Sequence, residues 1–361
     1  MTNRRPLIDW LPWLLLGSCL LYVASNLRPH RDGEFQLSAF GRLPVQDQGR
    51  VKPLDTLART SLMVISNRQT FWLSGESGTS DRERVNGHRK TRAVQWLLDV
   101  IARPKQARAY EIVRIDHPEV LSLIKAPDKR KYFSIDEIMA QEDELVRQFD
   151  LARGIDKNDW TPFQRQLMNL HNKLALYFTL EDAERLRFIP APKGVQDWTT
   201  IRSAGVGNSS GGQSMAYARS LTESLIAWRD QDFAAFNAAV KAASGLTDEV
   251  ASKTRARLNH EWDFNQAAPF MMAMALYVIV FVLAALSWLR NEGPLARSAL
   301  WILTLALVVH TVGLISRIYI QGRPPVTNLY SSAIFVGWGG VVLGLIQHHP
   351  TPPDENCRGI E

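Results

Sequence analysis

Long apolar segments are concentrated near the C-terminal end of the chain, at Pro269–Leu289, Ser298–Ile320 and Leu329–Gln347. Each has about 19 to 23 residues, which is enough to cross a hydrocarbon core of about 30 Å at 1.5 Å per residue. A shorter apolar stretch of about 15 residues lies within Met1–Asn26, after two arginines. We interpret this stretch as an uncleaved membrane anchor, and a cleaved signal peptide is the alternative.

Between these apolar parts the pattern changes to short amphipathic helices with charged surfaces. Leu57, Leu62 and Ile65 recur at helical spacing, and Ser134 precedes Glu137 by three residues, as in a capping box. The elements that we expect are helices over Asp55–Ser66, Arg92–Ala102, Ser134–Arg153, Thr161–Phe178, Ser214–Ala243 and Thr247–His260, short strands at Glu111–Ile115 and Arg187–Ile189, and a flexible loop at Gly205–Gly212.

These patterns predict a mainly α integral membrane protein with about four transmembrane helices. A helix-rich extracytoplasmic domain (28–267) lies between the first and second of them, after an anchor (1–27) and before a three-helix segment (268–347) and a polar tail (348–361). Two arginines lie in the N-terminal tail ahead of Trp10 and two in the short loop Arg290–Arg297, and the positive-inside rule assigns this tail and this loop to the cytoplasm. The large domain is therefore expected outside the cytoplasm, on a bacterial inner membrane.

Charge and cysteine content exclude several classes of function. Residues 28–267 hold 35 of the 42 basic and 31 of the 36 acidic residues, and the two signs alternate along the sequence. A nucleic-acid surface would need a clustered basic stripe, so we expect no nucleic-acid partner. The two cysteines, Cys19 and Cys357, belong to no C-x-x-C pair, which argues against a thiol oxidoreductase or a c-type cytochrome.

One histidine, His310, lies near the middle of a long apolar segment. Gly313 and Arg317 follow it by three and seven residues, on the same helical face. Ionisable residues at this depth are costly and usually have a function. The alternative is structural: His310 hydrogen-bonds to a neighbouring helix, and Gly313 allows close packing.

Two quoted segments carry a resemblance to a known family. The segment from His310 to Tyr330, HTVGLISRIYIQGRPPVTNLY, resembles the opening helices of the cytochrome c assembly family, the CcsA/ResC-type haem-handling proteins. The segment from Leu43 to Arg59, LPVQDQGRVKPLDTLAR, is similar to a segment that precedes this module in longer bacterial members. Together they cover roughly a tenth of the chain.

The resemblance implies a haem b site on this helix. His310 would be the metal ligand, Gly313 would leave space for the flat ring, and Arg317 would meet a propionate. Arg323, Asn328 and Tyr330 would present donors to a haem edge or to an apocytochrome. Equally, the prolines of this loop turn the chain and Asn328 caps the next helix.

The earlier segment contains the polar residues Gln46, Arg50, Lys52 and Asp55. From the sequence we expect an exposed polar loop that leads into a helix, and we assign it no chemical role. The other histidines show no H-E-x-x-H or other paired metal spacing, so no zinc site is expected.

The resemblance implies a role in cytochrome c biogenesis, namely haem delivery and attachment, with a ResB-type subunit, apocytochrome c and the lipid membrane as partners. A complete module of this family has six or more membrane helices and a tryptophan-rich outer loop, and neither follows Gln347 here. We therefore expect the front part of such a protein, which is truncated, frame-shifted near residue 347 or completed by another chain. No catalytic residue is assigned, although the family contributes to haem lyase activity.

Two other classes of function remain open. A membrane-anchored sensor or scaffold, without haem, would use its outer domain to bind a protein or solute. A secondary transporter has less support, because the sequence has no inverted repeat and few spans.

Overall fold

The computed structural model forms two compact units, which we describe separately. The membrane unit comprises Met1–His30 and Asp263–Glu361, and the large unit comprises Arg31–Trp262. The residues that the structure describes are 6–28, 31–74, 84–85, 88–126, 130–190, 197–201, 212–250, 252–290, 293–324, 326 and 329–347.

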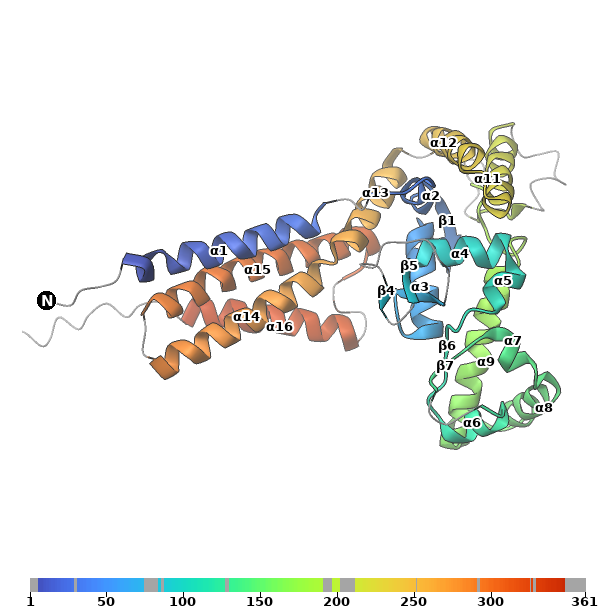
Figure 1. The fold of residues 1–361 in the computed structure, drawn as a ribbon, viewed down its shortest axis with the longest axis horizontal. Coiled ribbons are helices and arrows are strands. Elements are labelled where there is room, and N and C mark those ends of the chain that lie inside the picture. The colour runs from blue at the N-terminus through green and yellow to red at the C-terminus, as the bar shows by residue number, and fades with distance from the viewer. Residues whose placement is uncertain are drawn as a thin grey trace, which may run out of the picture. The chain divides into compact units, whose positions relative to one another are not determined.

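The membrane unit is a group of long helices around α15 (Gly293–Gln321), as Figure 1 shows. This helix contacts α1 (Pro6–Asn26), α14 (Pro269–Arg290) and α16 (Leu329–Gln347). An apolar core forms where α1, α14 and α15 meet, from Cys19, Met272, Ala273, Leu276, Leu283, Ala299, Ile302, Ala306 and Val309. By contrast, Ser331 is the one buried residue of α16, and the other residues of this helix are half-buried or exposed.

Within the described residues, three helices are long and apolar enough to cross a membrane. They cover Thr254–Leu289, Gly293–Gln321 and Leu329–Gln347, which confirms the three predicted apolar spans by length and composition. The described part of α1 is a shorter apolar helix, over Trp10–Asn26. A fourth span therefore stays a prediction, as does the side of the membrane on which the large unit lies.

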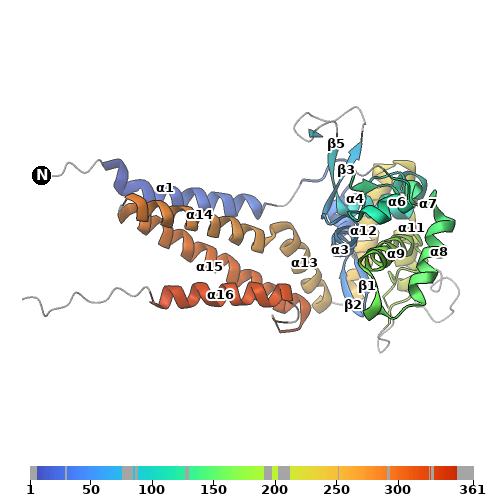
Figure 2. The same cartoon turned by 90° about the horizontal axis from the view of Figure 1, so that it is seen from below.

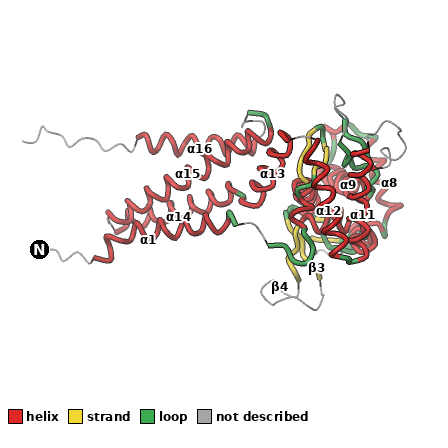
Figure 3. Tube along the Cα trace, turned by 90° about the horizontal axis from the view of Figure 1, so that it is seen from above, coloured by secondary structure: helices red, strands yellow, loops and turns green. Residues whose placement is uncertain are grey.

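The large unit is mainly helical, with short strands between the helices (Figures 2 and 3). Its helices are α2 (Leu37–Gly41), α3 (Leu54–Ser66), α4 (Ala93–Ala102), α5 (Pro104–Arg108), α6 (Pro118–Leu123), α7 (Ile135–Met139), α8 (Glu142–Arg153), the 3-10 helix η2 (Lys157–Asp159), α9 (Pro162–Glu181), α11 (Gly212–Asp230), α12 (Phe233–Val250) and α13 (Ser252–Ala267), whose last residues belong to the membrane unit.

The core of the large unit is built around α4, which is apolar on nearly all sides. Trp96, Leu97 and Leu98 of this helix are fully buried. A helix that is hydrophobic all round must be covered on all sides, and α3, α9 and α11 contact α4. Asp99 on the same helix is also buried, and its carboxylate accepts hydrogen bonds from two aromatic side chains, described in the Discussion.

Three small antiparallel sheets complete the large unit. Strand β1 (Pro44–Asp47) pairs with β2 (Arg50–Pro53), β5 (His88–Arg92) lies between β3 (Thr70–Ser74) and β4 (Arg84–Val85), and β6 (Val113–Arg114) pairs with β7 (Tyr132–Phe133). The expected strand at Glu111–Ile115 corresponds to β6. The expected strand at Arg187–Ile189 forms isolated bridges instead, because its partners Gln46 and Thr199 come from different segments.

Most predicted helices in the large unit are confirmed, with three errors in their bounds. The helix expected over Thr247–His260 corresponds to α13, which begins at Ser252, because Thr247 still belongs to α12. The predicted capping box at Ser134 is present, and α9 begins with a second capping box at Thr161, which we did not predict. The helix expected over Ser134–Arg153 is two helices, because α7 ends at Met139 and α8 begins at Glu142. The helix expected over Ser214–Ala243 turns at Gln231, whose φ of 59° is left-handed. The loop predicted at Gly205–Gly212 lies outside the described residues except for Gly212, which begins α11.

Candidate functional site

The segment from Leu43 to Arg59 forms a β-hairpin followed by a helix. Gln48 and Gly49 connect β1 to β2 with φ values of 51° and 75°. Two successive positive φ values match the twist of a two-residue hairpin, and glycine takes the second at little cost. The chain then enters α3 directly from Pro53, which is extended (φ −63°, ψ 149°) at the N-cap.

Three of the four polar residues named from this segment, Gln46, Lys52 and Asp55, are buried, and Arg50 is half-buried, which corrects the expectation of an exposed loop. Gln46 is 6% exposed, and its side-chain Oε1 accepts from the backbone N–H of Trp198 at 2.7 Å. Lys52 and Asp55 are 8% and 4% exposed, and they pair with Asp47 at 2.5 Å and Arg59 at 2.8 Å. The Lys52 pair joins the two strands of the hairpin, the Asp55 pair lies within α3, and the Gln46 hydrogen bond connects the hairpin to a distant segment.

Arg50 connects this hairpin to α13. Its two terminal nitrogens donate to the two carboxylate oxygens of Glu261 at 2.7 and 2.8 Å. The Glu261 side chain is 4% exposed, whereas the Arg50 side chain is 35% exposed. Nearby, the guanidinium of Arg42 lies 4.1 Å from the ring centre of Trp262. Burial of a carboxylate requires such a partner, and a bidentate pair is the strongest available.

His310 is buried between helices of the membrane unit, at 7% exposure. Its Nδ1 lies 3.2 Å from the hydroxyl of Tyr277 on α14, and the rings of Phe270 and Tyr277 approach it edge-on, with centroids 5.8 and 5.9 Å away. The backbone of Ile334 on α16 also interacts with the ring. Within the described residues, Nε2 makes no hydrogen bond of normal geometry.

The face of α15 beside Gly313 is filled by the ring of Phe270. A Cβ at Gly313 would lie 3.1 Å from that ring, so glycine permits this contact. The flat ring that packs there is thus the protein's own. A haem at this position would require the Phe270 side chain to move.

Two of the predicted site residues, Arg317 and Tyr330, lie in contact with each other. The guanidinium of Arg317, which is half-buried, lies 5.4 Å from the ring centre of Tyr330. This cation–π contact connects α15 to the start of α16. Arg323 is exposed, and Asn328 lies outside the described residues.

A contact that we did not predict from the sequence ties α16 to α15. The Trp338 indole N–H donates to the hydroxyl oxygen of Thr311 at 2.8 Å. Thr311 directly follows His310 on α15. The signal in the sequence was a tryptophan within an apolar segment, because its N–H needs a partner when water is excluded.

The donor chemistry at His310 fits haem ligation in part. A buried imidazole with one ring nitrogen free of hydrogen bonds within the described residues is the group that haem iron requires. Among those residues no group of three or more His, Cys, Asp or Glu is placed to hold a metal ion.

No family model matches the chain. Its sequence is similar to that of Protein NrfI from Wolinella succinogenes, with 22% identity over 364 residues. The similar region covers 92% of this chain and 38% of NrfI. The chain thus spans less than two fifths of the length of this relative, although the similarity extends over almost all of its own length.

Proposed function

We propose that this protein acts in cytochrome c biogenesis. The observation that carries the proposal is the similarity to NrfI, a cytochrome c maturation protein, over 92% of the chain. At 22% identity, the similarity supports this role at the general level. The two sequence segments that resemble the cytochrome c assembly family lie within the same chain and support the same role.

Within that role we assign His310 to contact with haem b. Its burial among apolar helices and its unpaired Nε2, within the described residues, support this assignment. Arg317 would bind a haem propionate, and its guanidinium would then leave the ring of Tyr330. Bound haem would supply the vinyl groups to which the cysteine thiols of an apocytochrome become attached. A ResB-type subunit, apocytochrome c and the lipid membrane are the partners that this role requires.

The visible absorption spectrum of the detergent-purified chain tests the haem assignment. We expect a Soret band, with α and β bands on reduction by dithionite, that falls severalfold in His310→Ala and less in Arg317→Ala. His171→Ala and Arg297→Ala are matched controls, because His171 lies on α9 of the large unit and Arg297 lies near the other end of α15. Both should keep the wild-type spectrum.

A haem-free spectrum from cells with ample haem would overturn the haem assignment. The biogenesis role has a separate readout, which is haem staining of c-type cytochromes in cells that lack the gene. Unchanged staining would favour the other class of function, a membrane-anchored sensor or scaffold.

A further inference from the structure

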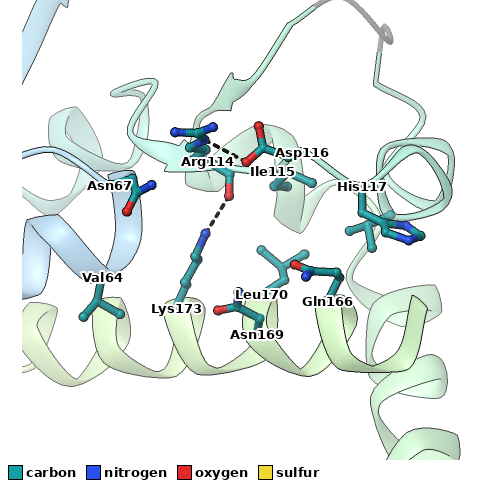
Figure 4. A pocket seen from close by; sticks show the side chains of 11 residues that line it. Val64, Asn67, Arg114, Ile115, Asp116, His117, Gln166, Asn169, Leu170 and Lys173 are labelled. Carbon is teal, nitrogen blue, oxygen red and sulfur yellow. Dashed lines mark hydrogen bonds and ion pairs between the residues drawn. The ribbon is translucent and has the colours of Figure 1, made fainter. Parts of the chain in front are cut away.

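A polar cleft of about 190 Å³ lies in the large unit, away from both segments discussed above. Figure 4 shows its walls: α9 on one side, the end of α3 on another, and the extended segment after β6 opposite α9. The side chains that line it belong to Val64, Asn67, Arg114, Ile115, Asp116, His117, Val120, Gln166, Asn169, Leu170 and Lys173. Most of its accessible surface is polar.

The charges in this cleft leave one ammonium group without a carboxylate. Arg114 is neutralised by Asp116, whose carboxylate lies 2.7 Å from the guanidinium. Lys173 Nζ donates to the backbone carbonyl of Arg114 at 2.7 Å, and it forms no ion pair within the described residues. Burial lowers the pKa of Lys173, although the nearby carboxylate of Asp116 acts in the opposite direction. An anion beside Nζ would stabilise the charged form.

Three amide side chains line the same cleft as this ammonium group. Gln166 and Asn169 precede Lys173 on α9 by seven and four residues, so the three share one helical face. Asn67, at the left-handed end of α3 (φ 61°), faces the cleft from another wall (Figure 4). None of these three amide groups makes a side-chain hydrogen bond to another described residue. Each can therefore donate to, and accept from, a ligand.

We propose that this cleft binds a small carboxylate that carries a second polar group next to the carboxylate. Lys173 binds the carboxylate, and the amides of Asn67 and Asn169 bind the second group. The side chains of the cleft carry a net charge of about +1, from Lys173, because Arg114 and Asp116 neutralise each other. This charge favours a monoanion over a phosphate, which carries more than one negative charge. The volume lies below the range of about 300–1,000 Å³ for drug-sized ligands, so the ligand is small. A hydroxy acid and the C-terminal residue of a peptide both have this chemistry.

Calorimetric titration of the detergent-purified full chain tests the proposal. The probes are glycolate for a hydroxy acid, N-acetylglycine for a peptide end, and N-acetylglycinamide as a neutral analogue. We expect one of the carboxylates to bind and the neutral analogue to bind at least tenfold more weakly, since a hydrogen bond to a charged group is worth about that factor. Tighter binding of N-acetylglycine assigns the site to peptide ends, and tighter binding of glycolate assigns it to hydroxy acids.

Lys173→Met should weaken binding by about tenfold, and Asn169→Ala by about fivefold. Lys157→Met, at an exposed position on η2, is the matched control and should bind as the wild type does. Asn169 is exposed, so its variant keeps the test valid if Lys173→Met does not fold. Wild-type affinity in both variants, equal binding of the neutral analogue, or no binding of either carboxylate at about 10 mM would overturn the proposal.

Discussion

Asp99 shows how a single charged residue is accommodated in the core of the large unit. Its carboxylate is 2% exposed and accepts hydrogen bonds from the Trp228 indole N–H at 2.9 Å and from the Tyr110 hydroxyl at 3.1 Å. Arg103, one turn later on the chain, lies 3.9 Å away. These contacts connect α4 to α11, so the residue links two helices that are far apart in sequence.

Removal of one donor to this carboxylate should destabilise the large unit. Trp228→Phe keeps most of the apolar ring and deletes the N–H, and we expect a loss of about 1–3 kcal/mol in the free energy of unfolding because a buried acceptor loses a partner. Guanidinium unfolding of the purified chain measures it. Trp160→Phe is the control, since its N–H donates to the neutral carbonyl of Ala152 and its loss should cost less. Equal losses in the two variants would contradict the prediction.

The residues of the candidate site could be predicted only in part. The depth of His310 follows from the apolar residues around it, and the structure buries it as expected. Its neighbours Phe270 and Tyr277 come from another helix, and periodicity within one segment contains no information on which helix packs beside it. The burial of Lys52 and Asp55 was missed because a sequence pattern does not show which distant segments cover a hairpin, although the partners Asp47 and Arg59 are close in sequence.

At the scale of single elements, capping boxes fix where two helices begin. At α7 the Ser134 side chain accepts from the Glu137 backbone N–H, and the Glu137 carboxylate accepts from the Ser134 backbone N–H at 2.8 Å. Arg130 also pairs with Glu137. Partial burial alone would raise the pKa of Glu137, but the Ser134 and Arg130 hydrogen bonds outweigh it and the pKa is lowered.

This lowered pKa predicts a pH dependence. The folded pKa of Glu137 lies below its usual value, so its charge stabilises the folded state above about pH 4.5, and this contribution is lost as the pH falls through the folded pKa. Wild type should therefore be more stable than Glu137→Gln at about pH 7, and the difference should shrink towards about pH 3. Thermal unfolding across this range measures it. A difference that stays constant with pH would show that the carboxylate charge is not responsible.

The elements that were predicted well are those that depend on length or on a local motif. Long apolar runs and the capping box at Ser134 are read directly from the sequence, and both were confirmed. The β1–β2 hairpin was missed because its four-residue strands are too short to show alternation and carry charged side chains. The break between Met139 and Glu142 was missed because no Pro or Gly marks it.

At the scale of the whole molecule, one ion pair joins the N-terminal and C-terminal parts of the large unit. Arg50 and Glu261 are separated by 211 residues and join the first hairpin to its last helix, α13. α13 continues along the chain towards α14, which begins at Pro269. The pair therefore connects the start of the large unit to the segment that leads into the membrane unit.

Loss of Arg50 alone should be more harmful than loss of both charges. Arg50→Met leaves a buried carboxylate unpaired, and we expect a cost of about 2–3 kcal/mol, reduced from the value for a fully buried pair because Arg50 is partly exposed. Arg50→Met/Glu261→Gln removes the unpaired charge and should recover most of this loss. Guanidinium unfolding of wild type and both variants measures the difference. If the double variant were as unstable as Arg50→Met, the unpaired charge would not be the cause.

The helices of the membrane unit differ in length, and this affects how they match a bilayer. At 1.5 Å per residue, the 29 residues of α15 extend about 43 Å, whereas the 22 of α14 and the 19 of α16 extend about 33 and 29 Å. The latter two match the hydrocarbon thickness, but α15 matches the full bilayer with its headgroups. In a thinner bilayer, α15 must therefore tilt or expose its ends. A change in the tilt of α15 would change its packing against α14, and the contact between His310 and Tyr277 joins these two helices.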